Sequence, residues 1–200
     1  MPTLEKYEWT NTWWDEPSNE GTRVLLVGDS ITNAYRSHVK DILGGEIYVD
    51  MLATSRALDN PALWEELRHM LVLTRYDVIH FNNGLHGFHL SRQQYEEGYE
   101  AILRDITVEN PNARVILALS TPVTRRDDCG ALSESENNTV IERNEVVVRL
   151  AERFCLPVDD LYTLVLGNAA IKSTDGYHFH IEGQKLQAAQ VAECILKRLS

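Results

Sequence analysis

The chain has 200 residues, of which 44% are hydrophobic, and it carries a formal net charge of −11 at pH 7. This length and composition fit one globular domain with its own core. The acidic charge, without any basic cluster, argues against nucleic acid and anionic membranes as partners, and no apolar run is long enough to span a bilayer.

The three cysteines, Cys129, Cys155 and Cys194, are widely spaced and odd in number. They form no disulfide framework by pattern, so we expect free thiols in a reducing compartment. The first residues carry charges where a signal peptide needs an apolar stretch. A cytoplasmic protein is therefore expected, with a removed signal peptide as the open alternative. The sequence does not indicate an oligomeric state.

The first 20 residues are polar but contain Trp9, Trp13 and Trp14. We expect residues 1–20 to form an arm that packs on the domain, since tryptophan side chains bury large areas. The alternative is that these rings wall one side of a binding cleft. Residues 21–200 are then a single domain.

Strands are predicted where the sequence has short, continuous apolar runs, a pattern typical of a sheet buried on both faces. The runs span residues 23–27, 47–52, 76–81, 114–119 and, more briefly, 156–158. Helical patterns lie between them. Strand–helix alternation of this kind predicts an α/β fold, a three-layer α/β/α sandwich with a central parallel sheet of about five strands.

Helix starts can be predicted at two serines. Ser91 has Gln94 three residues later, and Ser133 has Glu136, each a candidate capping box. The last helix is expected from about Glu182, with its inward face formed by Leu186, Ala189, Ala192, Ile195 and Leu199.

In an open parallel sheet, ligands bind outside the carboxyl ends of the strands. Polar residues follow four of the predicted strands, and a further polar group precedes the last helix. These segments are Gly28-Asp29-Ser30, Ala53-Thr54-Ser55-Arg56, residues 82–87, Ser120-Thr121-Pro122 and residues 175–180. A functional site is therefore predicted at this edge.

Ser30 stands where the first strand turns into a helix. A serine there can attack a carbonyl while its own backbone N–H faces the developing oxyanion. The alternative is a helix-capping serine. The α/β-hydrolase motif G-x-S-x-G is not met, because Thr32 occupies the place of its second glycine.

Asp175 and His178 lie three residues apart across Gly176, so they can share one turn. A serine hydroxyl needs an adjacent base, and a carboxylate can orient that base. The sequence thus predicts Ser30 as nucleophile, His178 as general base and Asp175 as its orienting residue. The alternative is a turn aspartate beside a surface histidine.

Gly28-Asp29-Ser30 near the start and Asp175-Gly176-Tyr177-His178-Phe179 before the last helix together resemble the SGNH (GDSL-like) hydrolase superfamily. The resemblance extends from about Arg23 to Leu199. It implies a flavodoxin-like α/β/α sandwich, a serine nucleophile at Ser30 and a D-x-x-H pair at Asp175 and His178. It also implies a carboxylic ester hydrolase that needs no cofactor and no metal.

Two positions depart from the superfamily pattern. The superfamily's oxyanion-binding glycine after the second strand is missing, and Ser55 or Arg56 is expected to fill its place through a backbone N–H. The superfamily's G-x-N-D motif reads Gly84-Leu85-His86-Gly87 here. We expect His86 to replace the asparagine as an oxyanion donor, with Asn83 as the rival.

Two other hypotheses stay open at this point. The first is a metal-dependent hydrolase built from His86, His89, His178 and His180 with Asp29 or Asp175. The second is a catalytically inactive ligand-binding member of the fold. For the esterase, the predicted substrate is a small acyl ester, with an O-acetylated carbohydrate as the preferred guess. His80, inside a strand pattern, is expected to be buried and hydrogen-bonded.

Overall fold

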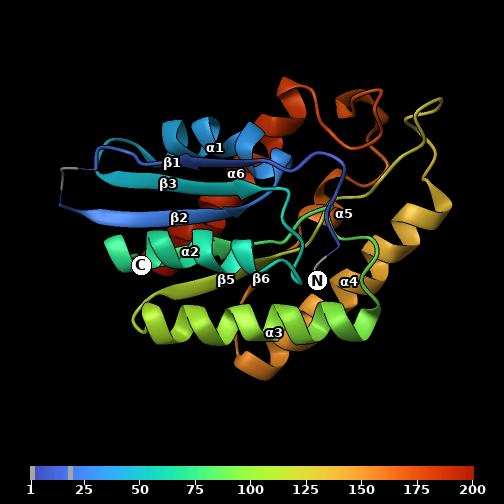
Figure 1. Cartoon of the computed structure of the whole chain (residues 1–200). Helices are drawn as coiled ribbons and strands as arrows, with labels where there is room; N and C mark the ends of the chain where they lie inside the picture. The colour runs from blue at the N-terminus through green and yellow to red at the C-terminus, as the bar shows by residue number, and fades with distance from the viewer. Residues whose placement is uncertain (1–2, 18–19) are drawn as a thin grey trace.

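A computed structural model describes residues 3–17 and 20–200 (Figure 1). Its sheet has the strand order β1-β3-β2-β4-β5-β6. The strands are β1 (Thr10–Trp13), β2 (Thr22–Gly28), β3 (Ile47–Thr54), β4 (Val78–Phe81), β5 (Arg114–Ala118) and β6 (Val158–Asp159). Strands β2 to β6 are parallel to one another, and their order is that of a flavodoxin-like sheet.

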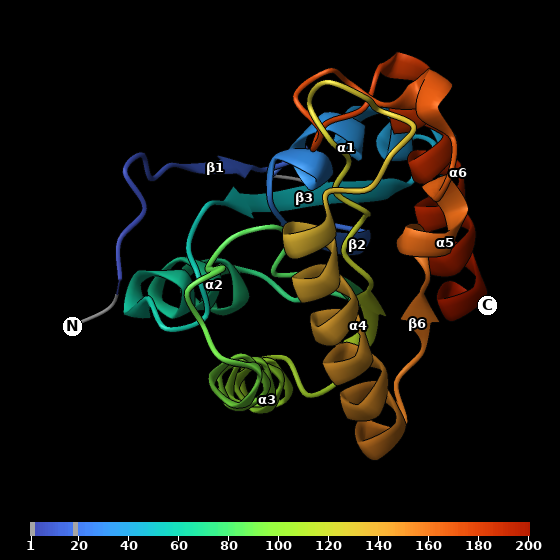
Figure 2. The same ribbon diagram turned by 90° about the vertical axis from the view of Figure 1, so that its right-hand side faces the viewer.

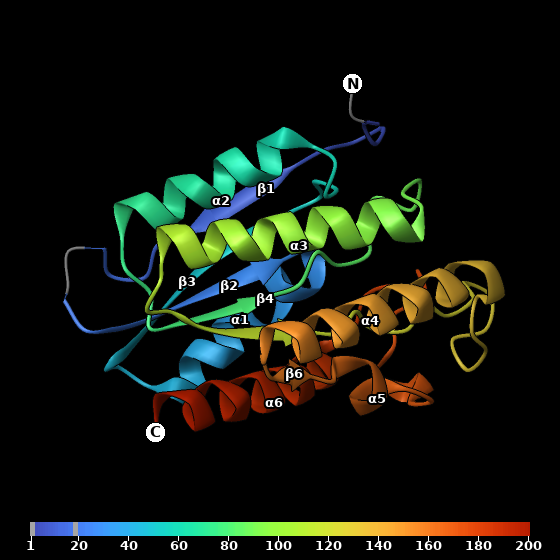
Figure 3. The ribbon, with the colours of Figure 1, turned by 90° about the horizontal axis from the view of Figure 1, so that it is seen from below.

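Helices cover both faces of the sheet, which confirms the predicted three-layer sandwich (Figure 2). The helices are α1 (Ser30–Leu43), α2 (Pro61–Leu73), α3 (Arg92–Glu109), α4 (Glu134–Phe154), α5 (Leu161–Val165), η1 (Ala169–Ile171) and α6 (Ile181–Leu199). Helices α1 and α6 pack on one face. Helices α2, α3 and α4 run side by side across the other (Figure 3).

Strand β2 shows how the continuous apolar runs serve two cores. Val24 and Leu26 face the core under α1 and α6, whereas Leu25 and Val27 face the core under α2, α3 and α4. All four side chains are buried. Successive side chains of a strand point to opposite faces, so a strand between two helical layers must be apolar at every position.

The sequence predicted a sheet of about five strands. The structure adds an antiparallel edge strand, β1, which belongs to the N-terminal arm. Residues Thr10–Trp13 pair with Met51–Thr54 of β3. All four β1 side chains are exposed. Such a strand is held by its backbone hydrogen bonds and has no apolar alternation, so a search for hydrophobic periodicity misses it.

The helix starts agree with the sequence at Ser91 and differ at Ser133. Ser91 and Gln94 form the complete capping box at α3. Ser133 precedes α4, but its hydroxyl donates to Glu136 and caps no backbone N–H.

The inward face predicted for α6 is partly wrong. Leu186 and Ala189 are exposed, while Gly183, Gln187, Ala188 and Val191 are buried with Ala192 and Ile195. A Cβ atom at Gly183 would come within 3.1 Å of Ile171, so the helix packs here through its backbone.

Cys129, Cys155 and Cys194 are free thiols, as predicted. Among the helices described, none combines the length and the hydrophobicity that a membrane crossing requires.

Candidate active site

Ser30 is the first residue of α1, directly after the carboxyl end of β2. Asp29 caps this helix, because its Oδ1 accepts a hydrogen bond of 2.8 Å from the backbone N–H of Ile31. The first N–H groups of a helix have no partner within the helix and carry partial positive charge. Ser30 therefore stands where a developing negative charge is stabilised.

His178 and Asp175 lie in the loop before α6 and meet Ser30 at the same edge of the sheet. Nε2 of His178 lies 2.8 Å from the Ser30 hydroxyl, and Nδ1 lies 2.6 Å from Oδ2 of Asp175. The three side chains thus form one continuous hydrogen-bonded chain. Such a chain can transfer the hydroxyl proton of Ser30 to His178.

The loop that carries this pair folds around the carboxylate of Asp175. Its Oδ1 accepts from the backbone N–H groups of Tyr177 and His178, at 2.8 and 2.9 Å. Gly176, which lies between Asp175 and Tyr177, has φ +82°, and a Cβ there would lie 2.3 Å from the carbonyl oxygen of Thr124. Only glycine fits this turn, and the turn places the Asp175 carboxylate beside the His178 ring.

The electrostatic state of Asp175 follows from these contacts. Burial raises the pKa of its carboxyl, but the hydrogen bonds from the backbone and ring of His178 and from Tyr177 outweigh it and lower the pKa to about 2. Asp175 is therefore ionised at any pH at which a histidine can act as a base.

Lys172 anchors the same loop from inside the protein. Its amine donates to the carbonyl oxygens of Pro122 and Tyr177, at 2.7 and 2.9 Å, and lies 4.0 Å from the centre of the Phe179 ring. The side chain is buried, and this burial lowers the pKa of Lys172 to about 8 although nearby Asp175 opposes the shift. Lys172 thus connects Tyr177, the residue before His178, to the loop after β5.

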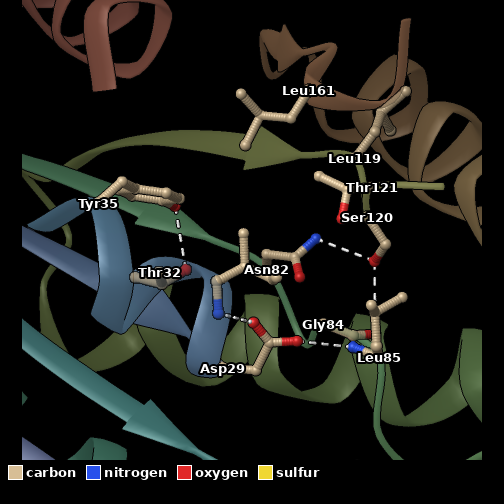
Figure 4. A pocket seen from close by; sticks show the side chains of 11 residues that line it. Asp29, Thr32, Tyr35, Asn82, Gly84, Leu85, Leu119, Ser120, Thr121 and Leu161 are labelled. Carbon is tan, nitrogen blue, oxygen red and sulfur yellow. Dashed lines mark hydrogen bonds between the residues drawn. The ribbon is translucent and has the colours of Figure 1, made fainter. Parts of the chain in front are cut away.

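A polar network joins Asp29, the residue before Ser30, to the loop after β4 (Figure 4). Oδ2 of Asp29 accepts from the backbone N–H of Leu85 at 2.8 Å. A Cβ at Gly84, whose φ is +69°, would lie 2.1 Å from that carboxylate oxygen, so glycine permits the close approach. Asn82 bonds to Ser120, whose hydroxyl donates to the Gly84 carbonyl. Ser30 and the loop after β4 are therefore supported by the same hydrogen-bonded network.

His86 lies in this loop and lines the same pocket as Ser30 and His178. Its Nδ1 lies 3.0 Å from both carboxylate oxygens of Glu5, a residue of the N-terminal arm. Glu5 also accepts from the backbone N–H of Gly87 at 3.3 Å. From the other side, Arg143 of α4 donates to the carbonyl oxygens of His86 and Gly87.

The other predicted oxyanion donors lie elsewhere. The Ser55 backbone N–H donates to the Trp9 carbonyl at 3.0 Å, and that of Arg56 points to the Thr54 hydroxyl at 3.2 Å. The Asn83 side chain is buried and donates to the Arg56 carbonyl. None of the three lines the pocket beside Ser30, whereas His86 does.

The pocket beside Ser30 has a volume of about 300 Å³. Its wall is formed by Glu5, Asp29, Ser30, Leu85, His86, Phe88, Tyr177 and His178. Neither Trp9, Trp13 nor Trp14 belongs to this wall. Trp9 packs edge-on against the His86 ring with 6.4 Å between ring centres, and Trp13 lies under the Arg36 guanidinium.

The histidines of the metal hypothesis are dispersed. His89 pairs with Asp59 at 3.1 Å, and His180 is exposed at the start of α6. Within residues 3–17 and 20–200, no three His, Cys, Asp or Glu side chains gather in a way that suits a metal ion. His80 is buried, with its Nε2 2.9 Å from Asp159.

Sequence reasoning missed Glu5 and Lys172. Both act through contacts that span the chain, 81 residues to His86 and 50 residues to Pro122. No spacing rule connects such positions. Glu5 is one of five acidic residues among the first 20, so its charge alone did not single it out.

No protein-family model matches the chain, and no curated protein sequence matches it either. Solved structures do resemble it. An aryl esterase from M. smegmatis aligns with a TM-score of 0.73 at 16% identity, covering 88% of this chain and 99% of the esterase. A carbohydrate acetylesterase from Sinorhizobium meliloti aligns with a TM-score of 0.72 at 14% identity, covering 88% and 99%.

A putative GDSL-like lipase from Parabacteroides merdae has higher identity, 21%, with a TM-score of 0.63 over 87% of this chain and 95% of the lipase. These likenesses and the strand order establish the fold. The chain has the fold of these proteins, which confirms the α/β/α sandwich that the resemblance noted from the sequence implied.

Proposed function

We propose that this chain hydrolyses small carboxylic esters through an acyl-enzyme intermediate on Ser30. One observation carries the proposal: the hydrogen-bonded chain from Ser30 through His178 to Asp175 at the wall of an open pocket. The fold supports it, because proteins described as esterases share this architecture at low sequence identity.

The reaction begins when His178 Nε2 takes the proton of the Ser30 hydroxyl and Oγ attacks the ester carbonyl carbon. The carbonyl π electrons move to oxygen, which becomes the oxyanion of a tetrahedral intermediate. When this intermediate collapses, the carbon–oxygen bond to the alcohol breaks and the alcohol leaves with the proton from His178. The acyl group stays on Ser30.

Water then repeats the sequence in the second half. His178 takes a proton from the water as its oxygen attacks the acyl carbon, and the bond to Ser30 breaks. The proton returns to Ser30 Oγ, and the carboxylic acid leaves. Asp175 remains ionised throughout, because hydrogen bonds hold its pKa near 2. It stabilises the imidazolium form of His178 without taking its proton.

Two donors are proposed for the oxyanion: the backbone N–H of Ser30 and the ring of His86. Both belong to the wall of the pocket. Donors fixed beforehand toward the oxygen stabilise the transition state more than the ground state.

The proposed substrate is a small acyl group on a polar alcohol, with an O-acetylated carbohydrate as the preferred candidate. The pocket is small, about 300 Å³, and its wall combines Glu5, His86 and Tyr177 with Phe88. Two proteins of the same fold are described as a carbohydrate acetylesterase and an acetyl xylan esterase.

An organophosphonate probe followed by peptide mass spectrometry tests the nucleophile. We expect a single adduct on Ser30, and Ser30→Ala should lower kcat by on the order of 10⁶-fold. Ser91→Ala, which changes another serine at a helix start, is the matched control and should keep both labelling and activity. Full activity of Ser30→Ala would refute the proposal. Activity that disappears on chelation and returns with zinc would favour the metal-dependent hypothesis.

A further inference from the structure

Ser30 shares its pocket with a second carboxylate–imidazole pair. Besides Asp175 and His178, the site contains Glu5 and His86, with His86 Nδ1 3.0 Å from both carboxylate oxygens. Glu5 belongs to the N-terminal arm, and no step of the proposed reaction uses it. A carboxylate at this position needs a reason, because it adds negative charge to a pocket where an oxyanion must form.

The contact at Nδ1 restricts what His86 can do at its other nitrogen. An imidazole that donates its Nδ1 proton to a carboxylate carries a lone pair at Nε2 when it is neutral. It can donate from Nε2 only as an imidazolium, with protons on both nitrogens. An ionised carboxylate beside the ring favours that charged form. If His86 serves the oxyanion, Glu5 is therefore its counter-ion.

We propose that Glu5 is a positioning residue of the oxyanion hole, which holds the His86 ring by Nδ1 and balances the charge of an imidazolium that donates from Nε2. The inference rests on the proposed function. It makes the N-terminal arm part of the catalytic apparatus.

The charged groups around His86 single out Glu5 as its counter-ion. Asp29 and His178 belong to the same wall, and the only carboxylate bonded to the His86 ring among the described residues is that of Glu5. Arg143 contacts the backbone carbonyl of His86, and its positive charge opposes a second proton on the ring. On the side of the arm, the ring packs edge-on against Trp9.

The arm is docked firmly enough to position a side chain. Glu8 forms an ion pair with Arg56 and accepts from Asn60. The backbone N–H of Trp9 donates to the Ser55 hydroxyl at 2.9 Å, and strand β1 follows directly. Glu5 is therefore held between strand β1 and the loop that carries His86, where it also accepts a hydrogen bond from the backbone N–H of Gly87.

The test uses steady-state kinetics on a small aryl ester with the full chain. Glu5→Gln keeps the shape and an accepting oxygen but removes the charge, and we expect kcat to fall by about 10-fold with little change in KM, less than the loss of a whole donor.

His86→Asn separates this role from simple support of the fold. An amide donates without needing a counter-ion, so adding Glu5→Gln to His86→Asn should cost almost nothing more. Glu8→Gln weakens docking of the same arm without removing the carboxylate beside His86, so it should lower kcat less than Glu5→Gln does. A Glu5→Gln penalty of equal size in both backgrounds would overturn the proposal.

A wild-type kcat in Glu5→Gln would also overturn the proposal. Phosphonate labelling distinguishes this failure from failure of the proposed function. If Ser30 is labelled and Glu5→Gln is silent, only the inference about Glu5 is wrong. If Ser30 is not labelled, the proposed function fails and the inference fails with it.

Discussion

The two carboxylate–imidazole pairs beside Ser30 are alike in chemistry and opposite in construction. Asp175 and His178 lie three residues apart in one turn, and the same carboxylate bonds to the ring and to the backbone of the turn. Glu5 and His86 come from an arm and a loop 81 residues apart. The first pair is assembled by local geometry, the second only by the complete fold.

This difference has a consequence for what each pair can tolerate. The local pair keeps its geometry as long as one turn survives, because Gly176 and the Asp175 carboxylate set that turn. The long-range pair depends on docking of the arm through Glu8 and Trp9. We therefore expect changes at the first pair to act on chemistry alone, and changes at the second to be sensitive to anything that loosens the arm.

The largest effect within the comparison is expected at Asp175. Asp175→Asn should keep the fold but lower kcat by on the order of 10⁴-fold, because the amide favours the wrong tautomer of the histidine. Stopped-flow measurement of acylation, with circular dichroism as the check on folding, gives the answer. A rate near wild type would mean that the tautomer of His178 is set by another group.

A smaller effect is expected at His86. His86→Ala should lower kcat by about 10²–10³-fold with little change in KM, the usual cost of losing one oxyanion donor. Asn83→Ala should cost less, because Asn83 is buried away from the pocket wall. His86→Asn should recover part of the rate. If Asn83→Ala lowered kcat strongly while His86→Ala kept a kcat near that of the wild type, the oxyanion donor would be Asn83 instead.

The smallest effect concerns stability and the anchor of the first pair. Burial lowers the pKa of Lys172 to about 8 from its usual 10.5. Between these values the folded protein binds fewer protons than the unfolded chain, so this residue makes the free energy of unfolding rise with pH. Below about pH 8 both states hold the proton and the contribution is constant.

Urea unfolding of the wild type and Lys172→Met across about pH 7 to 10 measures this contribution. The wild type should gain stability relative to the variant as the pH rises above about 8. A relative loss over that range would show that the folded protein retains the proton more strongly than the unfolded chain, the reverse of what burial of Lys172 implies.

The fold and the first pair could be predicted from the sequence because each depends on short, continuous segments of the chain. The parallel strands appeared as continuous apolar runs, and the turn from Asp175 to His178 could be recognised from its spacing and its glycine. Strand β1 escaped because its four side chains are exposed and its pairing is made by the backbone. The face of α6 was misplaced because Gly183 packs through its backbone, which hydrophobic periodicity does not register.

The oxyanion side was harder to predict for a related reason. His86 could be nominated from its place after a strand, but its partner could not. Glu5 is one of five acidic residues among the first 20, and only the path of the arm across the sheet edge brings it to Nδ1 of His86. Likewise, Ser55 occupied a plausible position along the chain, yet its N–H is already bonded to the arm at Trp9.

The antiparallel strand β1 has one further consequence. Because β1 pairs with β3 through its backbone and leaves its side chains exposed, it attaches the N-terminal arm to the sheet without adding side chains to the core. Of the residues before it, Glu5 contacts His86, while Glu8 and Trp9 dock the arm, so the position of β1 decides where these contacts form. A change in the arm upstream of β1 would therefore alter the pocket wall at Glu5 while leaving the central parallel strands unchanged.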